Sequence, residues 1–345
     1  MLPFLTLMSL LDWEFSNYDR PLSKKAPFIS AEACRACHTK TTEQWEKSRH
    51  ALSWSNALFQ EGYIAEPDPF CVFCHAPHAE QREETLKNEP WVRAMHPETG
   101  SLLNRPPRYP EPMADEGINC ATCHVREGKV IVSEPKPYAP HPTMVDARLS
   151  DSIFCKDCHD FPILERHNGE LIASTTPMQT TYQEWMAWKE TGGEASCQGC
   201  HMPDGRHDFH GANHRPLLRR SVAATVTKDG NEAVFSIQSV GVGHHVPSGD
   251  LFRHMTLELF VDDAWKEVEY IGRSFALQME EDRPHKRLVS DTALRPGEVR
   301  EYRKEWVSDR RWRLVYHYGS SLDEIRAVLP SSVLTEVLVE GRLSE

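Results

Sequence analysis

The chain has 345 residues, enough for two or three domains, and its formal net charge is −12 at pH 7. This acidic balance excludes a nucleic-acid-binding role, because such proteins neutralise phosphates with a basic surface. Residues 1–220 are rich in Pro, His and charged residues and poor in long apolar runs, so a core made of protein side chains alone would be small there.

Residues 1–30 are predicted to be an N-terminal arm or a remnant signal segment. The run Leu2–Leu11 is apolar, long enough for the hydrophobic region of an export signal and too short to span a membrane. It lacks a preceding basic region and a following cleavage site of the A-x-A type. The run is therefore interpreted either as a truncated signal or as a mature segment that packs on another surface.

Five copies of the motif C-x-x-C-H follow: CRACH (34–38), CVFCH (71–75), CATCH (120–124), CKDCH (155–159) and CQGCH (197–201). They use all 10 cysteines of the chain, namely Cys34, Cys37, Cys71, Cys74, Cys120, Cys123, Cys155, Cys158, Cys197 and Cys200. A zinc site or a disulfide framework does not require a histidine after every second cysteine.

The pattern is instead typical of c-type haem attachment. The two thiols add to the two vinyl groups of one haem, and the adjoining histidine becomes the proximal iron ligand. The sequence therefore predicts five covalently bound haem c groups. Their proximal ligands would be His38, His75, His124, His159 and His201.

Residues 31–216 are expected to form a pentahaem domain of helices and loops with little regular structure. Residues 30–54 are predicted to be a helix with Ser30 as its N-cap, and residues 181–192 a second helix ended by Gly192. Proline-rich loops separate the motifs: EPDPF, NRPPRYPEP and SEPKPYAPHP.

The pattern changes after Pro216. Residues 221–240 alternate between apolar and polar, with Asp229-Gly230 at a hairpin turn. Further strands are predicted within residues 254–272, 297–307, 310–319 and 331–343. Residues 217–345 are thus expected to form an immunoglobulin-like β-sandwich of about seven strands, which makes the predicted fold class α+β.

Three segments resemble the cytochrome c554-like multihaem family. They are CRACHTKTTEQWEKSRHA with its W-x-x-S-x-H-A signature, CQGCHMPDGRHDFHGANH with its C-x-x-C-H-M-P start, and GVGHHVPSGDLFR. The resemblance covers most of residues 31–255. It implies an electron carrier, although the family has enzymatic relatives such as hydroxylamine oxidoreductase and octahaem nitrite or tetrathionate reductases.

Five irons need five further ligands. Of the 18 histidines, 5 are proximal ligands and 13 are not. The resemblance implies His50 and His207 as distal ligands, with His214 as a third candidate. His141, fourteen residues before the fourth motif, and His244, in a turn before Pro247, complete the predicted set. The histidines that stay open as alternatives are His78, His96, His210 and His245.

The expected function is electron transfer along closely spaced, mostly bis-histidine haems. One alternative is a multihaem reductase or oxidoreductase acting on a small nitrogen or sulfur oxyanion, and another is a subunit of an extracellular cytochrome filament. No motif is C-x-x-C-K, the variant at the active haem of pentahaem nitrite reductases. We therefore expect an electron carrier rather than an enzyme and assign no catalytic residue.

The expected location follows from the cofactor, because bacteria attach haem c outside the cytoplasmic membrane. The protein is thus predicted to be periplasmic or extracellular. Its expected partners are redox proteins. Self-association and docking to a membrane redox complex are two further predictions.

Overall fold

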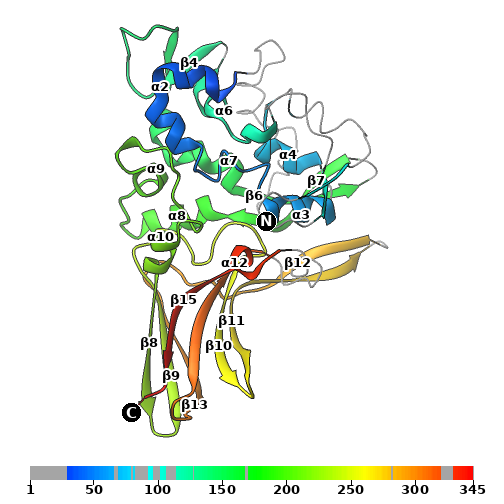
Figure 1. The fold of residues 1–345 in the computed structure, drawn as a ribbon, viewed down its shortest axis with the longest axis vertical. Helices are drawn as coiled ribbons and strands as arrows, with labels where there is room; N and C mark the ends of the chain where they lie inside the picture. The colour runs from blue at the N-terminus through cyan, green and yellow to red at the C-terminus, as the bar shows by residue number, and fades with distance from the viewer. Residues whose placement is uncertain are drawn as a thin grey trace, which may run out of the picture. The chain divides into compact units, whose positions relative to one another are not determined.

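The computed structural model describes residues 29–65, 69–78, 81, 92–95, 102–105, 114–126, 128–167, 170–280, 283–319 and 329–344. Most of the predicted N-terminal arm, and His96, lie outside these ranges. The chain, drawn in Figure 1, divides into two compact units. The first comprises Met1–Cys158, Leu164–Ser174 and Ser196–Phe209, and the second comprises His159–Ile163, Thr175–Ala195 and His210–Glu345.

Helix α2 (Ala31–Trp45) carries the first motif. The Ser30 side chain accepts a hydrogen bond from the backbone N–H of Glu32, which confirms the predicted N-cap. The prediction that the helix continues to residue 54 is wrong, because the chain leaves the helix after Trp45. At this point the Trp45 indole donates a hydrogen bond to the carbonyl of Ile118 at 2.8 Å. Because this contact joins segments that are distant in sequence, helix propensity does not predict it.

The other helical segments of the motif-bearing part are short. They are α3 (Ala57–Ala65), α4 (Pro69–His75), α6 (Cys120–His124), α7 (Lys156–His159) and α9 (Cys197–His201), with the 3₁₀ turns η1 (Ala114–Glu116), η2 (Ala147–Ser150), η3 (Ser152–Cys155) and η4 (Pro203–Gly205). Among the residues that the structure describes here, the apolar clusters are small. One small cluster contains Trp54, Tyr63 and Val72, and another contains Ala31 and Trp45.

Short strands also occur between the motifs. β1 (Val92–Met95) pairs with β2 (Leu102–Arg105), and β6 (Asp160–His167) with β7 (Glu170–Thr180). β4 (Lys129–Val132) pairs antiparallel with β3 (Val125–Arg126) and parallel with β5 (Thr143–Val145). The motif-bearing part therefore contains more strand than its sequence indicates.

The second unit contains a two-layer β structure. One sheet has the order β12-β11-β10-β14-β15 and the other the order β13-β9-β8. Their strands are β8 (Val222–Asp229), β9 (Glu232–Ser239), β10 (His254–Val261), β11 (Ala264–Glu280), β12 (Arg283–Asp291), β13 (Val299–Glu305), β14 (Arg311–His317) and β15 (Thr335–Arg342). The β8–β9 hairpin turns at the predicted Asp229-Gly230, where Gly230 has φ +59°. The fold class is therefore α+β, as predicted.

Both sheets contribute to the core of this unit. Ile237 of the three-stranded sheet packs with Met255 and Leu314 of the five-stranded sheet, and all three are fully buried. A second cluster, which includes Phe235 and Trp312, continues this core along the sandwich. Alternating strand residues face inward, as in a sandwich of two packed sheets.

The described part of the second unit also contains the helices α8 (Thr181–Glu190), α10 (Arg215–Arg220) and α12 (Ser331–Leu334). The prediction that Gly192 ends α8 is confirmed, since Gly192 has φ +98° and its N–H donates to the carbonyl of Lys189. Within the described part of the chain, none of the helices is both long and apolar enough to cross a membrane.

Candidate haem sites

Every C-x-x-C-H motif lies on a helical turn that stops at its histidine. Helices α4, α6, α7 and α9 end at His75, His124, His159 and His201. In α2 the backbone of His38 is non-helical, with φ −111° and ψ 40°. Residues i, i+3 and i+4 share one face of a helix, so both thiols and the imidazole of a motif face the same side. This is the donor set that one haem c requires.

The residues just before the motifs explain why these short turns form. Asn119 Oδ1 accepts hydrogen bonds from the N–H groups of Ala121 and Thr122. The Ser196 side chain accepts one from Gly199 N–H. Asn and Ser are preferred N-caps because they bind backbone N–H groups that have no partner within the helix. The caps therefore fix the helical spacing of the third and fifth motifs.

None of the ten cysteines forms a disulfide. Cysteine side chains of different motifs are neighbours in three pairs: Cys34 with Cys120, Cys74 with Cys158, and Cys155 with Cys197. Burial, opposed by Arg126 and aided by the neighbouring Cys158, raises the pKa of the Cys123 thiol to about 11. Each pair joins two motifs that are far apart in sequence, so the motifs are neighbours in space.

The predicted proximal ligand His124 faces the predicted distal ligand His207. Their ring centroids are 6.1 Å apart, and their planes differ by 34°. With about 2 Å from iron to each nitrogen and about 1 Å from that nitrogen to its ring centre, two axial imidazoles on one iron have centroids about 6 Å apart. The two rings therefore have the separation of an axial pair.

The Nδ1 atom of each of these two rings lies at a backbone carbonyl. His124 Nδ1 lies 3.2 Å from the Ile131 carbonyl oxygen, and His207 Nδ1 lies 2.9 Å from that of Gly205. Since a carbonyl can only accept, Nδ1 carries the proton and Nε2 keeps its lone pair. Burial lowers the pKa of both imidazoles, which favours the neutral form that binds a metal. The residues present fit a haem iron at this position.

Gln44 of α2 also positions His207. Its side-chain oxygen accepts a hydrogen bond from the His207 backbone N–H at 3.1 Å, although the two residues are 163 positions apart. Nothing in the local sequence indicates this role. It links the helix of the first motif to the segment that follows the fifth.

His50 lies in the turn after α2, not on the helix as predicted. Its carbonyl accepts a hydrogen bond from Ile118 N–H at 2.9 Å, and its ring meets Phe209 edge-on with centroids 4.3 Å apart. Phe209 is in turn 5.7 Å from His207. The structure therefore places His50 next to the third motif, although the motif that precedes it in sequence is the first.

His75 of the second motif has a similar anchor. Its Nδ1 lies 2.8 Å from the carbonyl oxygen of Ser53, and the Ser53 hydroxyl donates to the His75 carbonyl at 2.8 Å. The ring stacks on Phe59 with centroids 3.7 Å apart. The segment after α2 thus supports the second motif as well as the third.

The remaining predicted distal ligands occupy different settings. His141 is half-buried, and its Nδ1 is buried without a hydrogen-bond partner among the described residues. His214 precedes α10 and stacks on His210, with centroids 3.8 Å apart. His244 holds its Nδ1 2.8 Å from the carbonyl oxygen of His245. In His244, as in His124 and His207, Nδ1 is therefore the ring nitrogen that faces a backbone carbonyl.

A buried carboxylate fixes the loop that carries His244 and His245. Glu184 of α8 accepts hydrogen bonds from His245 N–H at 3.1 Å and from the Ser248 hydroxyl at 2.6 Å. The His245 ring lies 3.8 Å from Glu184 and 4.0 Å from Asp291. His245 is therefore surrounded by acids, whereas His244 is oriented by a carbonyl.

His78, which the sequence left open, has a structural role. It is 4% exposed, and its Nε2 lies 2.7 Å from Asn119 Oδ1 and 3.1 Å from the Thr122 hydroxyl. The ring thereby ties the segment after the second motif to the N-cap of the third. Asn119 was missed by the sequence analysis, although an Asn directly before a helical motif is an N-cap signal.

Comparisons with known proteins bear on the family and the fold of the chain. A family model described as outer membrane cytochrome MtrC/MtrF-like, domains II/IV, matches residues 27–214, just over half of the chain. The crystal structure of a penta-heme cytochrome c552 from Thermochromatium tepidum has a similar fold, with a TM-score of 0.66 and 22% sequence identity. The similarity covers 91% of this chain and 98% of that one.

No curated protein matches the chain. The family match covers all five motifs, and covalently bound haem c is the cofactor of such cytochromes. The chain therefore belongs to the MtrC/MtrF-like family of outer membrane cytochromes and is a multihaem c-type cytochrome of electron transport.

Proposed function

We propose that the protein binds five haem c groups, one at each motif, and transfers electrons between redox partner proteins through them. Haem iron supplies the one-electron chemistry, and the protein supplies ligation, spacing and burial. The five helical C-x-x-C-H turns support the number of haems. The printed name of the similar structure, a penta-heme cytochrome, is consistent with it.

The contacts between motifs support a connected arrangement, and they are the observation that carries this proposal. Neighbouring cysteine side chains bring together the first and third motifs, the second and fourth, and the fourth and fifth. Cys158 of the fourth motif also lies close enough to act electrostatically on Cys123 of the third. The fourth motif thus adjoins three others, so we infer a branched network with the fourth haem at its centre.

We further propose that most irons have two histidine ligands. His124 and His207 form the axial pair at the third motif, on the basis of their separation and anchored Nδ1 atoms. His50, His141, His214 and His244 are proposed as distal ligands of the other irons. Two histidine ligands on an iron leave no position open for a substrate, which favours a carrier over an enzyme.

The proposed location is the periplasm or the cell exterior. The name of the matching family model, outer membrane cytochrome, supports it. So does the chemistry of haem c attachment. We also propose docking to a membrane redox complex and self-association into larger assemblies.

Low-temperature EPR and visible spectra of the oxidised and reduced protein, with and without CO and nitrite, test the function. We expect low-spin signals and no spectral change with either ligand. A high-spin iron that binds nitrite, together with nitrite consumption under reducing conditions, would overturn the carrier proposal and support the reductase alternative.

A further inference from the structure

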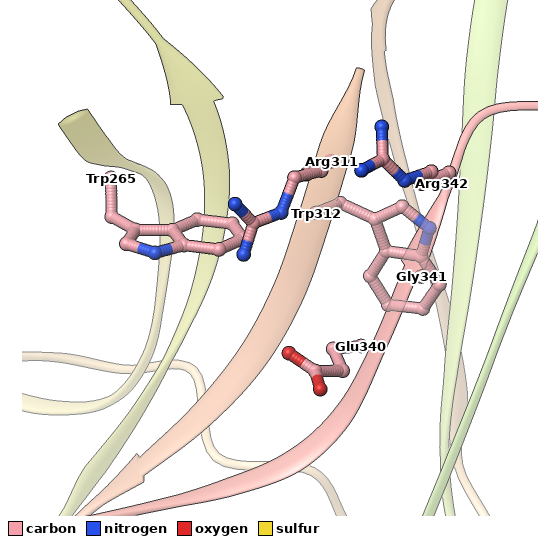
Figure 2. Close-up of a pocket in the computed structure, with 6 residues that line it drawn as sticks. All are labelled: Trp265, Arg311, Trp312, Glu340, Gly341 and Arg342. Carbon is pink, nitrogen blue, oxygen red and sulfur yellow. The ribbon is translucent and has the colours of Figure 1, made fainter. Parts of the chain in front are cut away.

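The five-stranded sheet of the second unit carries a pocket that electron transfer does not use (Figure 2). Its volume is about 240 Å³. The residues that line it come from the start of β11, the start of β14 and the end of β15, and they are Trp265, Arg311, Trp312, Glu340, Gly341 and Arg342. Aromatic rings combined with a few charged groups are typical of small-ligand sites.

Two arginines of the pocket are directly opposite each other. Arg311 of β14 and Arg342 of β15 are cross-strand partners in an antiparallel pair, where like charges destabilise the sheet. Neither forms an ion pair with a carboxylate in the described part of the chain. Arg342 donates to the Asp309 carbonyl at 3.4 Å. An anion placed between the two guanidinium groups would offset their repulsion.

The Arg311 guanidinium is already oriented. It lies 5.0 Å from the ring centroids of both Phe260 and Trp265, and Figure 2 shows it reaching toward the Trp265 ring. Such cation–π contacts hold the planar group while leaving its N–H donors for a ligand. The side chain therefore loses little conformational freedom when a ligand binds.

Glu340 adds an acceptor beside this pair. Its cross-strand partner is Arg313, but the Arg313 guanidinium is bound to Glu258 at 2.6 Å and lies 4.2 Å from the Trp265 ring centroid. The Glu340 carboxylate is exposed at the pocket. The pocket thus offers cationic donors for an acid group and a separate acceptor for hydroxyl groups.

A buried donor lies at the back of the pocket. Trp312 is 4% exposed, and its Nε1–H has no hydrogen-bond partner within the described ranges. Opposite it in the register is Gly341, where an added Cβ would lie 3.0 Å from Trp312 Nε1. The glycine therefore lets the buried indole pack closely against this strand, where a side chain would crowd it.

We propose that this pocket binds a carboxylated sugar, a hexuronate unit of an acidic polysaccharide. The arginine pair takes the carboxylate, since guanidinium groups match its geometry. Glu340 accepts from ring hydroxyls, and Trp265 forms an apolar wall against the sugar ring. The overall charge of −12 opposes polyanion binding, so recognition depends on these local arginines. The pocket would tie the cytochrome to an acidic matrix.

Titration calorimetry of the haem-loaded full-length protein with a galacturonic acid trimer tests the proposal. We expect saturable binding that weakens as salt rises. A neutral galactose trimer and inorganic phosphate, each titrated alone, should bind at least about tenfold more weakly. Equal binding of the neutral trimer, equal binding of phosphate, or no binding of the acidic trimer would each overturn the proposal.

Two variants connect binding to the pocket. Arg311→Gln removes one guanidinium and should weaken trimer binding by about tenfold or more. Gly341→Ala leaves all charges in place but crowds Trp312 Nε1, and it should also weaken binding. Arg303→Gln is the matched control, because Arg303 lies on β13 and binds Asp229 and Glu232. If Arg303→Gln weakened binding as much as Arg311→Gln, the pocket would not be the site.

Discussion

His124 and His207 face each other with ring centroids 6.1 Å apart, and each ring donates its Nδ1 proton to a backbone carbonyl. The two residues come from distant parts of the sequence: His124 ends the third motif, and His207 follows the fifth. Gln44, after the first motif, holds the backbone of His207. Three motifs therefore cooperate in forming one proposed iron site.

Replacing His207 tests this pair. His207→Ala should leave the iron of the third motif without its distal ligand, so one haem equivalent becomes high-spin and binds CO while the others stay low-spin. EPR and the CO difference spectrum of the reduced protein measure this. His285→Ala, on β12, serves as the control and should change neither spectrum. If His207→Ala kept every iron low-spin, the assignment would be wrong.

Replacing Gln44 tests positioning rather than ligation. Gln44→Ala removes the acceptor for His207 N–H and should lower the free energy of unfolding by about 1 kcal/mol. It should also shift the reduction potential of one haem, since the orientation of an axial ligand tunes the iron. Gln44→Glu keeps an oxygen that can accept from His207 N–H and should restore the free energy of unfolding, whereas its negative charge should itself lower the potential. A spectroelectrochemical titration of the three proteins is the measurement, and identical curves would argue against a positioning role.

Gly117 should not tolerate a side chain. It has φ +51°, and an added Cβ would lie 2.6 Å from the His50 carbonyl oxygen and 2.8 Å from that of Ala51. Gly117→Ala should therefore destabilise the protein by more than about 2 kcal/mol. Gly128→Ala is the matched control, because Gly128 has φ +72° but no atom within 4 Å of the added Cβ. Gly128→Ala should lower the free energy of unfolding by only about 1 kcal/mol.

Thermal unfolding followed by circular dichroism compares these two glycine variants. We expect a clearly larger fall in the midpoint temperature for Gly117→Ala than for Gly128→Ala. Equal falls would mean that the close contact between residues 50–53 and the start of the third motif does not exist in solution.

His244 and His245 provide a test with an internal control. His244→Ala should open one iron, which then becomes high-spin and binds CO, because His244 is the proposed ligand. His245→Ala should leave all irons low-spin, since its ring lies between Glu184 and Asp291. CO binding by the His245 variant alone would transfer the role to His245. CO binding by neither variant would end the proposal that this loop ligates an iron.

Features with a strong local signal could be predicted from the sequence. The five motifs, the Ser30 cap, the turn at Asp229-Gly230 and the end of α8 at Gly192 each depend on a few neighbouring residues. The strand β12 (Arg283–Asp291) was missed because its sequence is polar and contains Pro284. It is a strand because it pairs with the extended β11.

The site could be predicted only in part, because sequence patterns depend on residues that are neighbours in the chain. The donor residues follow from the motif, but their pairing depends on contacts between distant segments. The Gln44–His207 hydrogen bond and the Trp45–Ile118 hydrogen bond have no local pattern. The second of these forms where α2 ends, so His50 lies in a turn and not on a helix.

All five motifs are proposed to hold a covalent haem. Mass spectrometry of the denatured, exported protein measures this, combined with a thiol-reactive label that counts the cysteines that have not reacted. We expect a mass equal to the chain plus five haems, with no cysteine labelled. A mass with four haems or fewer, and a labelled pair of cysteines in one motif, would contradict it.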